Sequence, residues 1–519
     1  MRRAALASWP LAPVALAVLG AAGYLLLQPA SVDLAAHTYR AGLFDREGFA
    51  LWDNAWYGGH HVPGYSVLFP PVAAALGPRL AGALSAVASA ALFAALVHGH
   101  FGRAARVGAA WLGLGTLTVL LTGRLAFGFG LALGLAALLA LQRGRRNLAG
   151  ALAVACSLGS PVAGLFLALA GAALAARPPR RRDGATLALA ALAPVLALAL
   201  AFPEGGTEPF RFSAFYPVVL FAGLLLLILP AREGALRVGL LLYVLAALAS
   251  FAIPTPVGGN VTRLGALFAG PLAACLLWER RRGLLALCAL PLLAFQFAPA
   301  VRDVFEVRGD PSVGRAYYSP LLAFLARQAG PPARLEIPFT RSHWEAAWVA
   351  PHVALARGWE RQLDVSYDGL FYGSPLLPGT YRAWLSDLGV RWIALPDVPL
   401  DSSGREEARL LRAGLPWLRP VWSGEHWRVW EVREPGALAR GPASVTRLAP
   451  EEVDLAVKHP GRVVLQVRFT PYWALGAGAG CVGRAPGGWT ELTARASGTY
   501  RLLTRFSPGR VGARGARCD

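Results

Sequence analysis

The stretch that decides the fold covers residues 103–146 and reads RAARVGAAWLGLGTLTVLLTGRLAFGFGLALGLAALLALQRGRR. It holds two apolar runs, which are separated by Gly123-Arg124 and flanked at both ends by arginines. A membrane helix needs roughly 20 predominantly apolar residues, and somewhat fewer where neighbouring helices shield it. The stretch therefore predicts two antiparallel membrane helices, near residues 107–122 and 127–142.

The same alternation of apolar runs and short polar loops fills residues 1–301. Further runs of this kind lie near residues 9–27, 80–98, 148–157, 161–176, 185–202, 217–230, 236–252, 264–278 and 284–298. The two arms around Ser160-Pro161 are short, so they form either a tight hairpin or a broken helix that neighbouring protein shields. We thus expect a polytopic α-helical membrane protein with about 11 membrane segments.

The composition agrees with a membrane protein. Hydrophobic residues make up 55% of the chain and charged residues only 15%, whereas about a quarter of the residues in a soluble domain are charged. This excludes an ordinary soluble protein, and the apolar content also excludes a disordered chain. The formal net charge is +20. Because the arginines of residues 1–301 cluster in alternate loops, we interpret this charge as a topology signal and expect no nucleic acid partner.

Arginine placement predicts the orientation in the membrane. The arginine-rich loops carry Arg2, Arg3, Arg103, Arg106, Arg143, Arg145, Arg146, Arg177, Arg180, Arg181, Arg182, Arg232, Arg237, Arg280, Arg281 and Arg282. The opposite loops carry only Arg40, Arg46, Arg79, Arg124, Arg211 and Arg263. The positive-inside rule then places the N-terminus in the cytoplasm and the C-terminal region outside it, in a multi-pass plasma (inner) membrane protein. The first run could instead be a cleaved signal peptide, but no clear cleavage site precedes Asp33.

The periodicity changes after about residue 301, so we expect three regions. Residues 1–301 form the transmembrane domain with a long outer loop at 29–79, residues 302–440 read as an extracytoplasmic mixed α/β domain, and residues 441–519 read as a β-sandwich. Cys481 and Cys518 fall in the last region. An oxidising exterior permits a disulfide between them, although the sequence leaves free thiols equally open.

The outer loop 29–79 carries the residues best suited to chemistry. Asp33 and His37 are spaced i, i+4, and Arg40 lies on nearly the same helical face. Such a set suits a polar headgroup that bears phosphate: Asp33 as general base or, with His37, as a cation site, and Arg40 as phosphate partner. The alternative for Asp33 is a helix N-cap.

The rest of this loop is rich in aromatic residues, with further arginines expected at the same surface. The aromatic residues anchor the chain at the membrane interface or stack on sugar rings, and at most one of the two adjacent histidines is a metal ligand. Arginines from two later loops are candidates for donor phosphate or for lipid headgroups in general. The candidates for substrate binding are Trp56, Tyr57, His60, His61 and Tyr65, and the two later arginines are Arg124 and Arg263.

These features together resemble the polytopic GT-C glycosyltransferases, which use polyprenyl-phosphate sugars as donors. The resemblance rests on the DxxxH pattern of Asp33 and His37, on the stretch from Trp56-Tyr57-Gly58-Gly59 to Phe69-Pro70-Pro71, and on eleven expected crossings with an outer C-terminal domain. The tail from Pro460-Gly461 to Tyr472-Trp473 is similar to the β-domain of some YfhO-type bacterial membrane proteins.

The resemblance implies an inverting hexosyl- or pentosyltransferase that acts outside the cytoplasm on a cell-envelope glycan or glycolipid. Asp33 would deprotonate the acceptor hydroxyl, and a divalent cation (Mg or Mn) or an arginine would stabilise the departing lipid phosphate. Many members carry a paired acidic motif in this loop, but Val32 and Leu34 flank Asp33 here. That departure leaves Asp53 as the candidate second carboxylate.

Two other functions remain open from the sequence. A lipid or polysaccharide transporter is disfavoured because the membrane segments lack midplane charges and show no clear inverted repeat. A non-catalytic envelope scaffold would bind glycan or protein through outer-domain aromatics such as Trp344, Trp348 and Trp359, and would not depend on Asp33.

Overall fold

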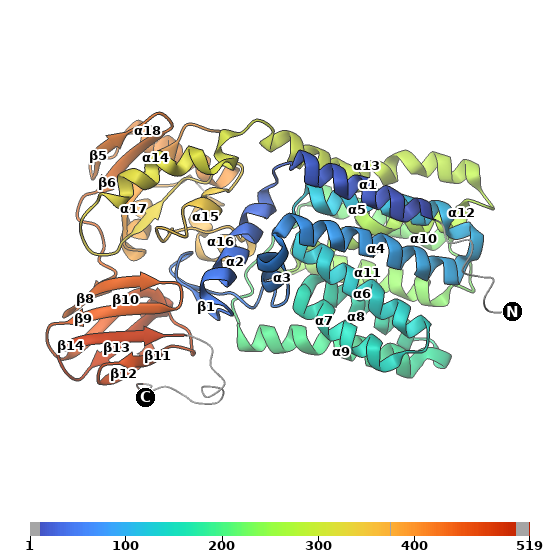
Figure 1. Ribbon diagram of the computed structural model, residues 1–519, viewed down its shortest axis with the longest axis horizontal. Coiled ribbons are helices and arrows are strands. Elements are labelled where there is room, and N and C mark those ends of the chain that lie inside the picture. The colour runs from blue at the N-terminus through green and yellow to red at the C-terminus, as the bar shows by residue number, and fades with distance from the viewer. Residues whose placement is uncertain (1–10, 374, 505–517, 519) are drawn as a thin grey trace. The chain divides into compact units, whose positions relative to one another are not determined.

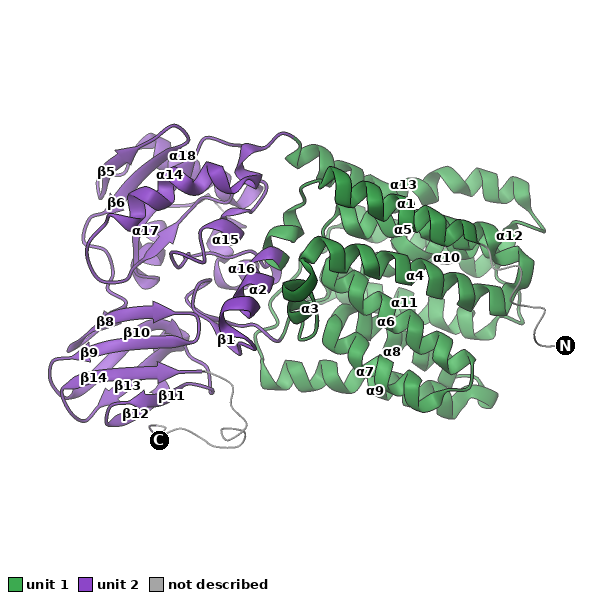
Figure 2. Cartoon of the chain, in the orientation of Figure 1, with its two compact units in different colours: residues 1–37, 64–308 green, residues 38–63, 309–519 purple. Residues whose placement is uncertain are grey.

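The computed structural model describes residues 11–373, 375–504 and 518 (Figure 1). The chain divides into two compact units (Figure 2). Unit 1 comprises Met1–His37 and Gly64–Arg308, and unit 2 comprises Thr38–Pro63 and Gly309–Asp519. The chain passes between the units at three places, and the first of them falls inside helix α2 (Val32–Glu47).

The described residues of unit 1 form helices joined by loops, and each expected membrane run corresponds to a helix, the first from residue 11 onward because residues 9 and 10 lie outside the described part. A short helix, α3 (Phe69–Leu76), lies near the end of the outer loop. The helices that correspond to the apolar runs are α1 (Leu11–Leu27), α4 (Pro78–Phe101), α5 (Ala105–Leu121), α6 (Leu125–Gln142), α7 (Arg146–Gly159), α8 (Pro161–Ala175), α9 (Arg181–Ala201), α10 (Phe212–Ile228), α11 (Gly234–Ala252), α12 (Thr262–Leu277) and α13 (Arg282–Val307).

The lengths of these helices indicate a membrane-embedded protein. Within the described residues, six helical segments are long and apolar enough to cross a bilayer, and a seventh arises if α1 and α2, bent by 78°, count as one span. Helices α8 and α10 are apolar but shorter. These helices fit a membrane protein with several crossings. The number of about eleven crossings remains a prediction.

Small residues allow the helices of unit 1 to pack closely. A Cβ on Gly184 of α9 would clash with the backbone nitrogen of Ala175 at the end of α8, and a Cβ on Gly108 of α5 would clash with Cys275 of α12. In a bilayer, helix association depends on such close contacts because lipid tails are as apolar as the side chains. Glycine and alanine therefore set the spacing of the bundle.

The loops of unit 1 gather at two ends. His100 pairs with Glu233 at 2.9 Å, and Arg146 pairs with Asp183 at 2.6 Å. These contacts join the loops after α4, α6, α8 and α10, which carry most of the arginines, and we call this the arginine end. The opposite end carries the start of α2, the α5–α6 loop, the start of α12 and the end of α13, and we call it the Asp33 end.

The first part of unit 2 is a mixed α/β layer, as the sequence predicts. Its four strands run in the order β3 (Arg334–Glu336), β4 (Val390–Pro396), β6 (Trp427–Val432) and β5 (Leu418–Ser423), and only β3 and β4 are parallel. The helices are α14 (Arg315–Ala326), α15 (Glu345–Trp348), α16 (Arg361–Tyr367), α17 (Pro378–Asp387) and α18 (Arg405–Ala413).

The last part of unit 2 holds two four-stranded antiparallel sheets. One has the order β12 (Gly480–Arg484), β13 (Trp489–Ala494), β10 (Gly461–Arg468), β7 (Ala439–Arg440), and the other β11 (Ala474–Ala477), β14 (Gly498–Leu503), β9 (Glu452–Val457), β8 (Ala443–Ala449). Val463, Leu492 and Leu502 are buried in the core between them. The outer loop adds the two-stranded pair β1 (Trp52–Asp53) and β2 (His60–His61) to unit 2.

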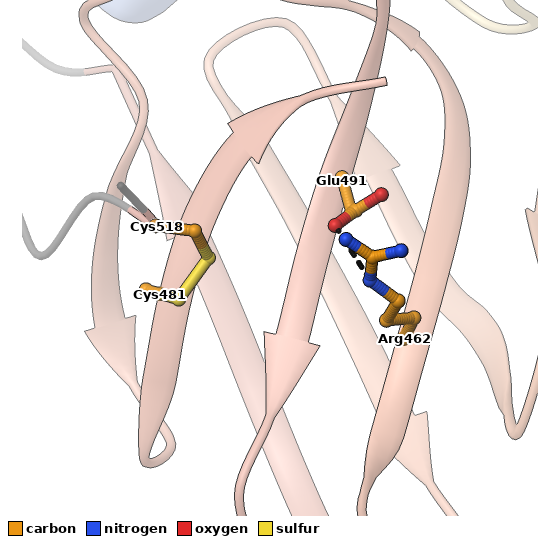
Figure 3. Close-up of a disulfide and its surroundings, with 4 residues drawn as sticks. All are labelled: Arg462, Cys481, Glu491 and Cys518. Carbon is orange, nitrogen blue, oxygen red and sulfur yellow. Dashed lines mark ion pairs between the residues drawn. A yellow bond between two sulfur atoms is a disulfide. The ribbon is translucent and has the colours of Figure 1, made fainter. Parts of the chain in front are cut away.

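A disulfide joins Cys481 of β12 to Cys518, so the pairing that the sequence left open is made in the structure (Figure 3). Arg462 and Glu491 form a surface ion pair at 3.2 Å on the neighbouring strands β10 and β13 (Figure 3). The disulfide thereby fixes a residue close to the C-terminus to an edge strand of the β12-β13-β10-β7 sheet.

Candidate functional site

Asp33 lies in the first turn of α2, one residue into the helix. This differs from the N-cap position that we considered, because Ser31 rather than Asp33 precedes the first helical residue. The positive end of the helix dipole favours a carboxylate at this position. About a third of the side chain (35%) is exposed, so the carboxylate is accessible while still lying against the bundle.

Gly123 places an arginine next to Asp33. Its φ is +70°, and a Cβ at this position would clash with Ser31 and would lie 2.7 Å from the backbone nitrogen of Leu34. The α5–α6 loop can therefore press against the start of α2 only because residue 123 is glycine. As a result Arg124 Nε lies 4.0 Å from Asp33 Oδ2.

Arg263, in the first turn of α12, is the second arginine of the site. Its guanidinium lies over the Phe127 ring, 5.4 Å from the centroid, and within electrostatic range of Arg124, Asp33 and Glu208. The Nε atoms of Arg124 and Arg263 are buried, and within the described part of the chain neither donates a hydrogen bond. Two arginine donors thus remain available beside one carboxylate.

Asp303 of α13 contributes a second carboxylate. It lies within electrostatic range of Asp33 and Arg124, and it pairs with its neighbour Arg302 at 3.5 Å. The four side chains Asp33, Arg124, Arg263 and Asp303 come from α2, the α5–α6 loop, α12 and α13. They form what we call the Asp33 cluster.

His37 and Tyr65 lie beside the Asp33 cluster in unit 1. The His37 ring is buried, with ring centroids 5.7 Å from Tyr65 and 5.1 Å from Phe69. Tyr65 is also within electrostatic range of Arg263. The i, i+4 spacing of Asp33 and His37 is realised within α2, and the histidine packs there against aromatic rings.

Arg40 is held within unit 2 by a different carboxylate. It forms an ion pair with Glu360, it is only 4% exposed, and its guanidinium lies 5.5 Å from the centroid of the Trp56 ring. The charge expected to meet a phosphate is therefore balanced by Glu360. We do not include Arg40 in the Asp33 cluster.

Asp53 is buried in unit 2. It accepts hydrogen bonds from the hydroxyl of Tyr39 at 2.7 Å and from the backbone N–H of Ala55 at 2.9 Å. Burial raises the pKa of Asp53 to about 6, and the two donors oppose this rise. Because both oxygens serve to hold the outer loop together, Asp303 replaces Asp53 as our candidate second carboxylate.

The remaining candidates of the outer loop are packed inside unit 2. The Trp56 ring stacks on Tyr39 with centroids 4.3 Å apart and on His60 at 5.5 Å, and the Tyr57 hydroxyl donates to the carbonyl of Gly358 at 2.6 Å. Burial lowers the pKa of His60 to about 3, so this ring is neutral at ordinary pH. His61 lies 2.9 Å from the Thr470 hydroxyl. These aromatic and imidazole groups fold the loop onto unit 2.

Of the three tryptophans named for a scaffold function, Trp344 and Trp359 are buried and Trp348 is half-buried. Trp344 stacks on Trp348 with centroids 5.4 Å apart, and Trp359 stacks on His343 at 3.5 Å. Trp344 and Trp359 are 5% and 7% exposed. Their packing supports the α/β layer and leaves little ring surface for a glycan.

Asp303 of the Asp33 cluster and the neighbouring Gly123 were not among the candidate site residues from the sequence. Asp303 follows an apolar run without a motif, and only the fold brings it near Asp33. Gly123 carried a usable signal, since a Gly-Arg pair between two membrane helices is typical of a tight turn.

The described residues contain no group of three or more His, Cys, Asp or Glu side chains arranged to hold a metal ion. Asp33 and Asp303 alone would supply two carboxylates, and the arginines beside them already balance that charge. No family model matches the chain, and no curated protein matches it significantly.

Proposed function

We propose that the chain is a membrane glycosyltransferase that moves a sugar from a polyprenyl-phosphate donor to a cell-envelope glycan or glycolipid. One observation carries the proposal: an accessible carboxylate, Asp33, lies 4.0 Å from Arg124 and close to Arg263, at one end of an apolar helical unit. A base beside two anion-binding donors is what the transfer of a sugar from a lipid phosphate requires.

In the proposed reaction the Asp33 carboxylate takes the proton of an acceptor hydroxyl. The acceptor oxygen then attacks the anomeric carbon from the face opposite the phosphate, and the bond between that carbon and the phosphate oxygen breaks. This gives an inverted product and a polyprenyl phosphate. Arg124 and Arg263 stabilise the negative charge that develops on the phosphate, because their Nε–H groups donate no hydrogen bond among the described residues.

The role of a divalent cation was left open by the resemblance to GT-C enzymes. Asp33 and Asp303 are the carboxylates that would hold one, and a cation there would add positive charge at the leaving phosphate. The described residues do not assemble a third ligand of this kind. We therefore assign the stabilisation of the phosphate to the two arginines.

The proposal includes a topology of eleven crossings with a cytoplasmic N-terminus. The arginine end of unit 1 then lies at the cytoplasmic surface, as the positive-inside rule requires. The Asp33 cluster lies at the opposite surface, where a carrier lipid presents its sugar to the cell envelope. Unit 2 follows α13 in the chain and is extracytoplasmic.

The test is Asp33→Asn in the full chain, reconstituted in nanodiscs with radiolabelled polyprenyl-phosphate hexoses and pentoses and a cell-envelope glycan extract. We expect transfer to fall at least about 100-fold, because general-base catalysis contributes about 10²–10⁴. The matched control is Asp45→Asn, which makes the same change at an exposed position of the same helix. Equal activity of Asp33→Asn and Asp45→Asn, or no transfer from any donor, would contradict the proposal.

A further inference from the structure

Unit 1 contains a second feature, a cavity of about 600 Å³ among α4, α6, α8, α10, α11, α12 and α13. Its volume falls within the range of about 300–1,000 Å³ that is usual for small-molecule sites. The wall is almost entirely apolar and includes six phenylalanines: Phe93, Phe101, Phe166, Phe221, Phe268 and Phe295. A hydrocarbon chain would fit such a wall.

The arginine, glutamate, histidine and glutamine residues that line the cavity belong to the arginine end. They are His100, Gln142, Arg177, Arg180, Arg232 and Glu233. The Glu233 carboxylate contacts both His100, at 2.9 Å, and Arg232, at 3.5 Å, so its negative charge is divided between these two partners. Arg177 and Arg180 are exposed and form no ion pair among the described residues. We call this end of the cavity its mouth. The mouth therefore carries a positive charge that the Glu233 carboxylate does not balance.

Glycine positions one of these arginines. A Cβ on Gly234, the first residue of α11, would clash with the guanidinium of Arg177. The Arg177 side chain can therefore lie directly against the start of α11, at the rim of the cavity. Any larger residue at position 234 would displace it.

The depth of the cavity matches one leaflet of a bilayer. Along α11 its lining runs from Gly234 to Tyr243, which is about 14 Å at 1.5 Å per residue. Half of a hydrocarbon core roughly 30 Å thick is about 15 Å. A lipid whose headgroup sat at Arg177 would thus reach the level of Tyr243 with the end of its tail.

We propose that this cavity binds an anionic glycerophospholipid of the leaflet at the arginine end. The tail occupies the phenylalanine-lined cavity, and the phosphate is held by Arg177, Arg180 and Arg232. The positive mouth selects an anionic headgroup over a zwitterionic one. This site is separate from the Asp33 cluster and does not depend on the proposed transferase activity.

The experiment uses the delipidated full chain in detergent and native mass spectrometry. The probes are dioleoyl phosphatidylglycerol and dioleoyl phosphatidylcholine, which share the same tails. We expect phosphatidylglycerol to bind about 30- to 150-fold more tightly, since two or three arginines act on one negative charge. The double variant Arg177→Gln/Arg180→Gln should lose this preference, whereas Arg280→Gln/Arg281→Gln, at the same end but outside the cavity lining, should keep it.

A second variant tests the cavity itself. Ala170→Phe fills part of the apolar lining and should weaken binding of both phospholipids. Equal affinity for the two phospholipids, or equal loss of preference in both double variants, would overturn the proposal. So would binding of undecaprenyl phosphate at Arg177 and Arg180 without binding of phosphatidylglycerol, because the cavity would then be a carrier-lipid site.

Discussion

At the scale of single residues, the Asp33 cluster balances two carboxylates with two arginines at the end of an apolar bundle. Asp33 is partly exposed and Arg124 approaches it without forming a close ion pair, since their nearest atoms are 4.0 Å apart. A tight ion pair would hold the base in a fixed hydrogen bond. The looser arrangement leaves the carboxylate able to accept a proton and the guanidinium able to meet a phosphate.

Arg124→Ala tests the role of the arginine. We expect kcat/KM for sugar transfer to fall about 100-fold, because removal of one preorganised donor to a developing negative charge typically costs 10²–10³. Initial rates with the reconstituted full chain measure this. Arg211→Ala is the control, since Arg211 is exposed and outside the cluster. A similar fall in both variants would mean that general surface charge, and not Arg124 in particular, supports activity.

Asp53→Asn tests the structural role of a buried carboxyl. The pKa of Asp53 is raised to about 6 from an ordinary value of 3.8, so the folded state binds more protons than the unfolded state between these values. The carboxyl therefore costs stability as pH rises from about 4 to 6, on the order of 3 kcal/mol in total. The difference in melting temperature, Asp53→Asn minus the native chain, should therefore become more positive from pH 4 to pH 7.5.

Transfer by Asp53→Asn at pH 7 should match that of the native chain. A melting-temperature difference that is independent of pH would show that Asp53 does not titrate in this range. If Asp53→Asn lost as much transfer activity as Asp33→Asn, Asp53 would be the second catalytic carboxylate.

The residues of the Asp33 cluster differ in how well the sequence could identify them. Asp33 and His37 are four residues apart, and helical spacing alone brings them onto one face. Arg124 and Arg263 stay candidates from the sequence, because the expected topology places their loops at the same surface as Asp33. Asp303 had no local signal, because it is 270 positions from Asp33 and only tertiary packing brings it close. The ion pair of Arg40 with Glu360 could not be predicted, because the two residues lie far apart in the sequence.

At the scale of elements, the α5–α6 turn is the part of unit 1 on which the cluster depends. Gly123 has a positive φ and lies against the start of α2. Gly144, in the α6–α7 turn, has a similar φ of +77° but has open space around it. The two glycines therefore separate the effect of backbone conformation from the effect of close packing.

Gly123→Ala should lower both stability and transfer, whereas Gly144→Ala should lower stability alone, and by less than Gly123→Ala. Both variants bear the cost of about 1–2 kcal/mol for an alanine at positive φ. Only Gly123→Ala also pushes Arg124 away from Asp33. We expect its kcat/KM to approach that of Arg124→Ala, as measured by the same initial-rate assay. An equal kcat/KM in the two glycine variants would show that the close contact of residue 123 with α2 does not support transfer.

Elements differed in how far the sequence could predict them. The apolar runs of residues 9–298 matched helices closely, because a bilayer leaves the backbone little alternative. Strand Trp427–Val432 could be predicted from the sequence, because WRVWEV is rich in tryptophan and valine, which favour strands. Strand Gly480–Arg484 was not, since GCVGR has little strand character and its conformation comes from pairing with Trp489–Ala494.

At the scale of the whole molecule, the cysteines report on which compartment holds unit 2. Cys156, Cys275 and Cys288 of unit 1 are free, and Cys481 and Cys518 of unit 2 are bonded. Disulfides persist in extracytoplasmic compartments and are rare in the cytosol. With the proposed topology we expect Cys481 and Cys518, two of the five cysteines, to resist alkylation as long as no reductant is added.

Mass spectrometry of the denatured chain after alkylation should count three labelled thiols without reductant and five with it. Cys518→Ser should add one label without reductant, at Cys481. Five labels in the absence of reductant would indicate a reducing compartment and would reverse the orientation inferred from the arginines.

The most direct test of the central claim is an electron cryo-microscopy structure of the full chain with a non-hydrolysable polyprenyl-phosphonate sugar. The proposal predicts that the phosphonate lies between Arg124 and Arg263, with the sugar within reach of the Asp33 carboxylate. Phosphonate density at the arginine end, or on unit 2 away from Asp33, would contradict it.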